Sequence, residues 1–311
     1  MSKIHHWDCI ELLKKVWENT VDLVLTDPPY NFEFLNHKRS HDEVKRRTER
    51  VKNSKTLVKH IPYGSGLSWW VRNKRRYEKN YNNIIEYWEW CEERWKECFR
   101  TLKPWWIILV FNSSRTVSHV QVALEKCWFY ARDILVWRRH SWIPKWVNFE
   151  KKMEKMWHEN PSRYRWRHSC LRQEWEWVVV LQKPLINNYH TTVLEYWVWL
   201  FKAESWDISW FQGNIFEWYK RDKKDEYNSH CTIKPIKLIE DLIEMCVPLE
   251  NERVVLDPFM GSWTTAVACR NLWVSYLWYE INKEYYEICE KRLKNIGNTK
   301  WLLSKEKVLT S

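Results

Sequence analysis

Residues 21–31 read VDLVLTDPPYN, and this stretch decides the fold. Its apolar residues at 21 and 23–25 are typical of a buried parallel strand. Two consecutive prolines, Pro28 and Pro29, cannot continue a sheet ladder, so the strand is expected to end at Asp27. Ligands of open α/β sheets bind beyond the carboxyl ends of the strands. Asp27 is therefore a candidate site residue, although an aspartate that caps a plain strand-to-turn corner would fit the same pattern.

A second stretch, VVLDPFMGSWTT at 254–265, repeats the pattern far downstream. An apolar strand ends in Asp257 and Pro258, a helical run follows at 266–272, and a short strand at 274–280 ends in Glu280. Strand, tight loop, helix, strand and acid make a mononucleotide-binding unit. In such a unit the helix N-terminus faces the ligand and the final carboxylate binds ribose hydroxyls.

Together, DPPY at 27–30 and DPF-x-GS-x-TT at 257–265 resemble the amino-methyltransferases of DNA, which use S-adenosylmethionine. The order, with DPPY ahead of the cofactor motif, is similar to that of the permuted beta class. The resemblance covers residues 8–293. It implies an α/β fold with a doubly wound, mostly parallel seven-stranded sheet, Rossmann-like and permuted, with basic insertions. Residues 1–311 would form a single catalytic domain.

The resemblance also assigns roles to residues. The catalytic set would be Asp27, Pro28, Pro29 and Tyr30. The family's Gly-Asp-Cys turn matches residues 7–9, and its H-x-T-x-K-P segment matches residues 230–235. S-Adenosylmethionine would be held by Asp8, Cys9, Thr232, Lys234, Asp257, Pro258, Phe259, Gly261, Ser262, Trp263, Thr264, Thr265 and Glu280.

Two of these segments have a purely structural alternative. Asp8 fits equally well as the N-cap of a helix over 10–16, and both roles are compatible. Pro235 fits the first turn of a helix over 237–246. The resemblance favours the functional reading for Thr232 and Lys234, which would hold the methionine end of the cofactor. No metal is expected.

The chemistry expected of DPPY is methylation of an exocyclic amino group. Tyr30 would stack on a base flipped out of the duplex. The Asp27 carboxylate and the Pro28 carbonyl would accept hydrogen bonds from the amino group, and Asp27 would receive or relay the leaving proton. Aspartate in this motif favours adenine N6, because the cytosine N4 enzymes of the family more often have Ser-Pro-Pro-Tyr. Cytosine N4 is the alternative.

Positive charge is concentrated in two regions. Residues 31–83 hold 14 Lys or Arg against 5 Asp or Glu, and residues 138–172 hold 10 against 3. The chain as a whole carries +11, so the remainder is acidic, at −5. Segregated charge is typical of a nucleic-acid footprint rather than of a solvated face. We expect a basic insertion at 31–83, a target-recognition region at 138–230 interrupted by a core strand at 174–182, and double-stranded DNA as the partner.

The remaining elements follow the βαβ rhythm of a doubly wound sheet. Helices are predicted over 84–101 and 116–126, and strands over 107–111 and 131–137. Residues 185–228 give no clear pattern. An RNA or small-molecule methyltransferase on the same sheet is a rival function; the basic insertions disfavour a small substrate, but charge does not separate RNA from DNA.

Tryptophan is the anomaly of the composition, at 26 residues against 5 glycines. Average glycine usage is about 7 per cent, or about 22 residues here. Trp7, Trp105, Trp106, Trp263 and Trp278 stand where the family has glycine. We hypothesise that most tryptophans, Trp90 and Trp137 excepted, are glycines in the native protein, whose gene would read UGA as glycine. A naturally Trp-rich chain is the alternative, and with Trp263 taken literally it would imply a DNA-binding protein with a dead cofactor site.

The other compositional features are unremarkable for an enzyme of this kind. The nine cysteines form no C-x-x-C pair and are expected to be reduced and mostly buried. No apolar run of membrane-spanning length and no signal peptide is present, so a cytoplasmic protein with no membrane contact is expected. A homodimer is left open.

Overall fold

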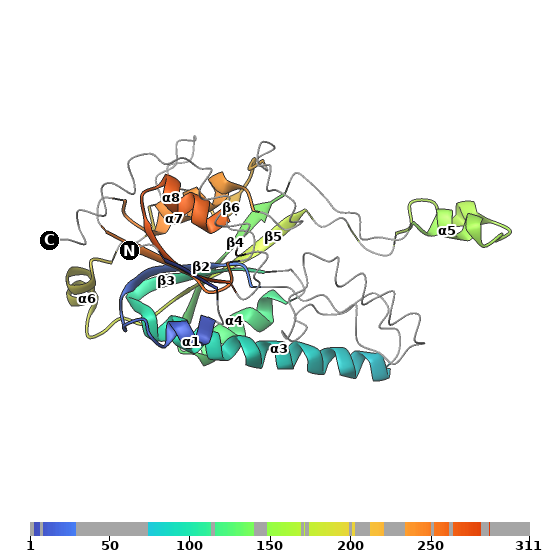
Figure 1. The fold of residues 1–311 in the computed structure, drawn as a ribbon. Helices are drawn as coiled ribbons and strands as arrows, with labels where there is room; N and C mark the ends of the chain where they lie inside the picture. The colour runs from blue at the N-terminus through green and yellow to red at the C-terminus, as the bar shows by residue number, and fades with distance from the viewer. Residues whose placement is uncertain are drawn as a thin grey trace.

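The computed structural model describes residues 3–6, 9–28, 74–112, 116–139, 148–168, 171, 174–198, 201–202, 212–220, 234–249, 252–260, 264–280 and 286. Their core is one sheet with helices on both faces (Figure 1). The strands are β1 (Lys3–His6), β2 (Val21–Thr26), β3 (Leu102–Asn112), β4 (Tyr130–Arg138), β5 (Trp175–Gln182), β6 (Ile215–Phe216), β7 (Val254–Asp257) and β8 (Ser275–Glu280).

The strand order is β1-β8-β7-β2-β3-β5-β4-β6. All neighbours from β1 to β3 are parallel, β5 runs antiparallel between β3 and β4, and β6 pairs in parallel with β4. The predicted doubly wound, mostly parallel sheet of seven strands is confirmed, with the two-residue β6 added at one edge. The short β1 was not predicted.

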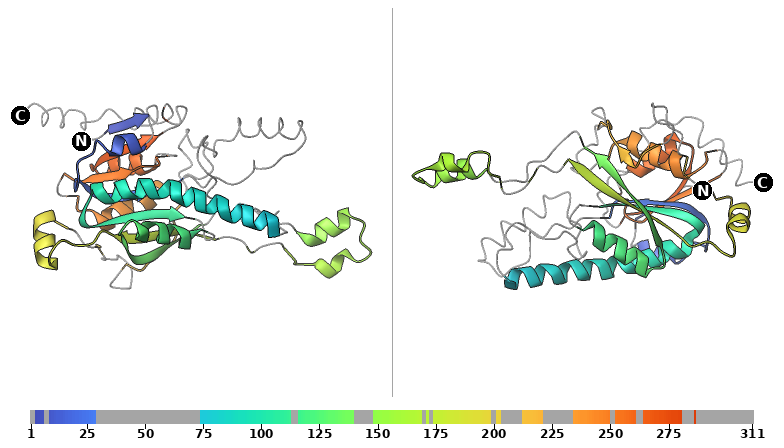
Figure 2. Two further views of the ribbon diagram at one scale, coloured as in Figure 1. Left: turned by 90° about the horizontal axis from the view of Figure 1, so that it is seen from below. Right: turned by 180° about the vertical axis from the view of Figure 1, so that it is seen from behind.

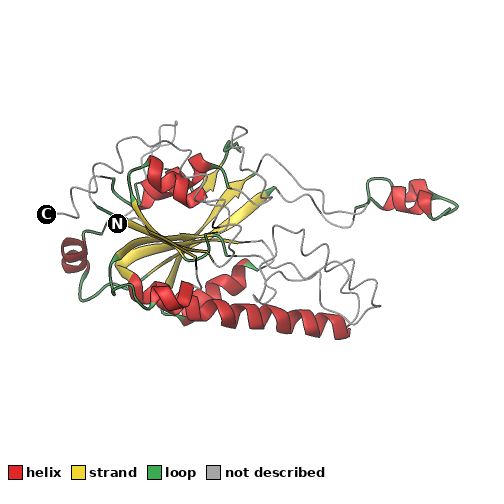
Figure 3. Ribbon diagram, viewed as in Figure 1, coloured by secondary structure: helices red, strands yellow, loops and turns green. Residues whose placement is uncertain are grey.

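The helices form two layers (Figures 1 and 3). One face of the sheet is covered by α1 (Cys9–Leu13), α3 (Lys74–Thr101) and α4 (Val117–Lys126), and the other by α7 (Ile236–Cys246) and α8 (Thr264–Asn271). Helix α6 (Tyr189–Tyr196) lies beside one end of the sheet, and α5 (Phe149–Lys155) with the 3-10 helix η1 (Pro161–Tyr164) reaches far from the opposite end (Figure 2).

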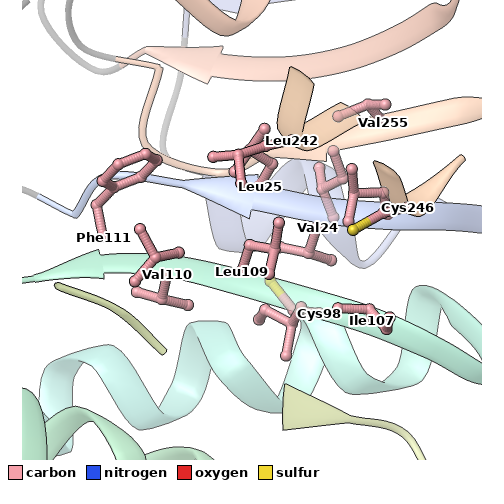
Figure 4. Packing of buried hydrophobic residues seen from close by; sticks show 14 of the residues in the cluster. Val24, Leu25, Cys98, Ile107, Leu109, Val110, Phe111, Leu242, Cys246 and Val255 are labelled. Atoms are coloured by element: carbon pink, nitrogen blue, oxygen red, sulfur yellow. The ribbon is translucent and has the colours of Figure 1, made fainter. Parts of the chain in front are cut away.

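Burial on both faces explains why β2 and β3 are continuously apolar. All six residues of β2 are buried. Figure 4 shows Leu25 and Leu109 of the two central strands between Cys98 of α3 and Leu242 of α7. A parallel strand sandwiched in this way has no solvent face and needs no alternation of polar residues.

Two boundaries differ from those predicted. Strand β3 begins at Leu102 instead of 107, because Leu102 pairs with Val21 and Ile107 with Leu23, so residues 103–106 bulge opposite the single residue 22. Helix α3 begins at Lys74 instead of 84, since residues 74–83 contain no glycine or proline that would end it. Ten residues of the expected basic insertion are therefore helical, and residues 31–73 lie outside the described residues.

The predictions about cysteines and about membrane-spanning helices can be compared with the described residues only. Six cysteines there are free thiols, and all are buried, as predicted: Cys9, Cys91, Cys98, Cys127, Cys246 and Cys269. No helix in the described ranges has the length and apolarity needed to cross a bilayer.

Candidate active site

The fold brings the two Asp-Pro motifs to the same edge of the sheet. Strands β2 and β7 are paired in parallel, with Leu23 opposite Val255 and Val24 opposite Leu256. Their carboxyl ends therefore meet, and the Thr26 hydroxyl donates to Asp257 Oδ1 at 2.5 Å. The fold thus brings the ends of the two motifs together across 231 positions of the chain.

The Asp27 carboxylate has two unlike oxygens. Its Oδ2 accepts a hydrogen bond from Lys234 Nζ at 2.5 Å. Its Oδ1 is buried and has no hydrogen-bond partner among the described residues. A buried acceptor without a partner costs free energy, and sites that bind a ligand are where such groups are found. Asp27 thus has one fixed oxygen and one that a donor can occupy.

Lys234 is held between two carboxylates and a ring. Its ammonium also lies 3.6 Å from Glu176 Oε1 and 4.9 Å from the centre of the Phe111 ring. Burial lowers the pKa of Lys234, but the Asp27 and Glu176 carboxylates outweigh this, and the net shift is upward. Lys234 is therefore charged, and Glu176 is in turn 3.9 Å from Arg139.

Asp257 holds the loop after β7 in place. Its Oδ1 also accepts from the Phe259 amide at 3.1 Å, and its Oδ2 accepts from the Thr265 hydroxyl at 3.0 Å. Burial raises the pKa of Asp257 to about 6, although these hydrogen bonds oppose the shift. Both oxygens are used inside the protein, so the carboxylate ties β7, the loop and the start of α8 together.

The segment of Lys234 and Pro235 joins the same edge. The Thr264 hydroxyl at the start of α8 donates to the Lys234 carbonyl at 3.3 Å. Phe259 packs against Trp90 and Trp95 of α3, with ring centres 5.5 and 5.6 Å apart. Loop, helix start and the buried lysine are thus assembled by contacts between segments far apart in the chain.

Strands β1 and β8 continue this edge of the sheet beyond β7. His6, the last residue of β1, is opposite Glu280, the last residue of β8, and α1 begins at the buried Cys9. Pro258 follows the end of β7 directly, and Pro28 follows the end of β2 after the single residue Asp27. Four parallel strands therefore end together beside a helix N-terminus, which is the arrangement that suits a nucleotide-like ligand.

Several predicted site residues lie outside the described residues, and their roles stay predictions. They are Asp8, Pro29, Tyr30, Thr232, Gly261, Ser262 and Trp263. The side chain of Glu280 is likewise not described. Sequence reasoning missed Thr26, Phe111 and Glu176. An acid in the apolar strand WEWVVVLQ was the signal for Glu176, because a buried strand carries a charge only where a partner meets it.

Fold and site together define a Rossmann-like methyltransferase. The DNA methylase family model matches residues 21–291, and the chain belongs to this family. The methyl donor of the family is S-adenosylmethionine, as the motifs predicted.

The chain is similar to curated proteins over nearly its whole length. It is 26% identical to Type II methyltransferase M.HindIII of Haemophilus influenzae, over 98% of both chains. It is 23% identical to DNA adenine methyltransferase YhdJ of Escherichia coli K12, over 93% of this chain and 82% of that one.

Solved structures share the fold at lower identity. The complex of M1.HpyAVI with SAM superposes with a TM-score of 0.52 at 19% identity, covering 94% of this chain and 100% of that one. The cytosine-N4-specific PvuII DNA methyltransferase gives a TM-score of 0.58 at 16% identity, covering 96% and 88%.

Proposed function

We propose that this DNA methylase transfers methyl from S-adenosylmethionine to N6 of adenine at specific sites in duplex DNA. The observation that carries the proposal is Asp27 at the tip of β2, with Oδ2 anchored on Lys234 and Oδ1 without a hydrogen-bond partner among the described residues. An exocyclic amino group is a weak nucleophile because its lone pair is delocalised into the ring. An acceptor placed on its N–H draws that lone pair out of conjugation, which is the task that Oδ1 is placed to perform.

The chain's own groups bind and orient the amino nitrogen. Asp27 Oδ1 and the Pro28 carbonyl accept hydrogen bonds from its two N–H groups, and Tyr30 stacks on the extruded base. When bound, S-adenosylmethionine would supply the methyl group from its sulfonium, and the sulfur would keep the electron pair of the S–C bond as the amino nitrogen takes the methyl. The nitrogen then gives up one proton towards Asp27 Oδ1, from which it passes to water. Positioning the two reactants supplies much of the rate enhancement.

A basic arm supports DNA as the substrate. This arm, residues 148–168, carries six Lys or Arg against three Glu. No residue of α5 or η1 is buried. The arm is closed by a bridge between Asn148 and His168 and extends from the carboxyl end of β4 (Figure 2). An exposed cationic hairpin beyond the catalytic edge is suited to phosphate contacts.

The identity of the methylated base is the more specific part of the proposal. Asp27 in DPPY and the adenine enzyme YhdJ among the relatives favour N6. Cytosine N4 is the second candidate, because the PvuII enzyme shares the fold. The name of M.HindIII, a Type II methyltransferase, supports site-specific modification of the kind found in restriction–modification systems.

Base-resolution sequencing of methylated DNA tests the proposal. Cells that lack DNA methyltransferases would express either the printed chain or the chain with glycine at position 263. The expected result is N6-methyladenine within one recurring sequence. The version that methylates DNA is the parent for the variants below, and absence of methylation with both versions would refute the proposed function.

A further inference from the structure

Lys234 sits too deep and too well paired to be an ordinary surface contact. Its side chain is 5% exposed, and Asp27, Glu176 and Phe111 surround the ammonium. These three residues come from β3, β5 and the tip of β2, so the packed sheet fixes the ammonium position. A charge-assisted hydrogen bond from a fixed donor in turn fixes the plane of the Asp27 carboxylate.

We propose that Lys234, backed by Glu176, is a positioning residue for Asp27 rather than a ligand of the cofactor's methionine end. The inference rests on the proposed function. Lys234 keeps Oδ2 occupied, which leaves Oδ1 as the acceptor for the amino group. Glu176 holds the lysine from the other side, and Arg139 offsets its charge at 3.9 Å.

Replacement of the lysine separates the two roles. Lys234→Met should lower kcat by about 10²-fold, since a displaced reactive group costs that much. Its affinity for S-adenosylmethionine, measured by calorimetry, should be unchanged. Lys234→Arg should recover part of kcat because it restores the cation. Glu176→Gln should lower kcat less than Lys234→Met, because the lysine keeps its contact with Asp27.

The matched control is Lys103→Met. Lys103 pairs with buried Asp22 at 2.6 Å near the opposite end of β2, so its loss removes a comparable ion pair away from the site. This variant should lower the melting temperature and leave kcat unchanged. Weaker cofactor binding by Lys234→Met, with kcat intact at saturating cofactor, would overturn the proposal, as would normal kcat and normal affinity. If no chain methylates DNA, the proposed function fails, while calorimetry still decides whether Lys234 binds the cofactor.

An independent observation concerns backbone conformation. Nine residues other than glycine have positive φ in the described part of the chain, and two of them, Asn19 and Asn187, are of a type that tolerates it. The other seven are Trp105, Trp128, Trp157, Trp166, Trp197, Trp218 and Trp273, with φ from 51° to 71°. For a bulky residue this conformation is a true outlier, whereas glycine adopts it freely.

Four of these tryptophans end helices in the way that glycine does. After α4, the amide of Phe129 donates to the Leu124 carbonyl across Trp128. After α8, the amide of Val274 donates to Cys269 across Trp273. The same six-residue closure spans Trp157 after α5 and Trp197 after α6. This is the Schellman motif, whose left-handed residue is usually glycine.

Burial of the indole does not offset the backbone strain at most of these positions. Six of the seven side chains are exposed, from 60% at Trp273 to 94% at Trp157. By contrast, Trp90 in α3 has the Arg94 guanidinium 3.7 Å from its ring centre and packs on Phe259. Among the seven, Trp105 is the exception, since it is half-buried with its ring 5.8 Å from that of Tyr130. At the exposed positions 128, 157, 166, 197 and 273, neither the backbone conformation nor burial favours tryptophan.

We infer that these seven positions are glycines in the native protein, encoded by codons that the printed translation renders as tryptophan. Of the positions where the family has glycine, Trp105 meets the criterion of positive φ. Trp106 and Trp278 have no positive φ and are buried at 1% and 0%, so the backbone gives no reason for glycine there. Trp7 and Trp263 lie outside the described residues.

Peptide mass spectrometry of the protein from its native source tests the inference directly. Glycine is expected at positions 128, 157, 197 and 273, and tryptophan there would overturn the proposal. A recombinant series isolates the physical cause. At positions 128 and 273, glycine should raise the melting temperature by about 2–4 °C each, because it removes the strain of a left-handed residue.

Alanine at the same two positions is the sharpest control. It removes the indole but keeps the Cβ that causes the strain, so it should give little of the gain. Trp90→Gly should lower the melting temperature, since it removes a packed side chain and places glycine inside a helix. Equal melting temperatures for the glycine and alanine variants would contradict the backbone argument.

Discussion

At the scale of single residues, the two carboxylate oxygens of Asp27 differ in whether they have a hydrogen-bond partner. Removing one partner of a fully buried ion pair destabilises a protein by about 3–5 kcal/mol, which is an upper bound for the Asp27–Lys234 pair because the Asp27 side chain is 27% exposed. Lys234 holds Oδ2 of Asp27 in such a pair, and the proposed function assigns the unpartnered Oδ1 to the substrate. The ion pair with Lys234 therefore makes the two oxygens of Asp27 different from each other.

Asp27→Ala should abolish methyl transfer while cofactor binding survives. The variant removes the acceptor for the amino group, and a loss of about 10²-fold or more is expected for a positioned acid–base group. Transfer of labelled methyl to DNA and calorimetry with S-adenosylmethionine measure the two quantities. Near-normal turnover would show that Asp27 is not the catalytic carboxylate.

Asp257 should make stability depend on pH in the unusual direction for a carboxylate. Burial raises its pKa in the folded state to about 6, so the folded protein binds the proton more tightly than the unfolded chain does. The contribution is fully present below the unfolded value near 4, and it is lost as the pH rises through about 6. Thermal unfolding of the parent and of Asp257→Asn should reveal it: the parent should gain stability relative to the variant from pH 7 to pH 5. A constant difference would refute the raised pKa.

At the scale of elements, the apolar pattern of the sequence predicted the buried strands, whereas other element boundaries are decided by packing. Strands β2, β5 and β7 ended within a residue of the predicted bounds, because burial on both faces leaves a continuous apolar run. The bulge at residues 103–106 could not be predicted because it depends on how β3 pairs with β2. The extra turns of α3 could not be predicted because they rest on helix propensity without apolar periodicity.

The basic arm gives a prediction of its own. Alanine at Arg163, Arg165 and Arg167 should weaken DNA binding and flatten its salt dependence by about 0.9 per lost phosphate contact. Binding isotherms at several salt concentrations give the slope. As a control, alanine at Lys14, Lys96 and Lys237 removes the same charge from cations that already pair with acids three or four residues away in the chain, and the slope should not change. Equal slopes for the two triple variants would mean that the arm is a solvated charged surface without phosphate contacts.

At the scale of the whole molecule, the order of the two motifs predicted the sheet. What the sequence could not reveal are contacts between distant segments. Lys234 meets Asp27 across 207 positions, and Glu176 joins them from an antiparallel strand. The region 185–228 was unreadable because α6 and the two-residue β6 are held by tertiary contacts instead of their own periodicity.

Nucleoside mass spectrometry of DNA from cells that express the parent or its Asp27→Ala variant tests the central claim most directly. The measurement needs no knowledge of the recognition sequence, and it identifies the methylated base and the residue responsible together. We predict N6-methyladenine with the parent and none with the variant. N4-methylcytosine in place of N6-methyladenine, or undiminished N6-methyladenine with Asp27→Ala, would contradict this account.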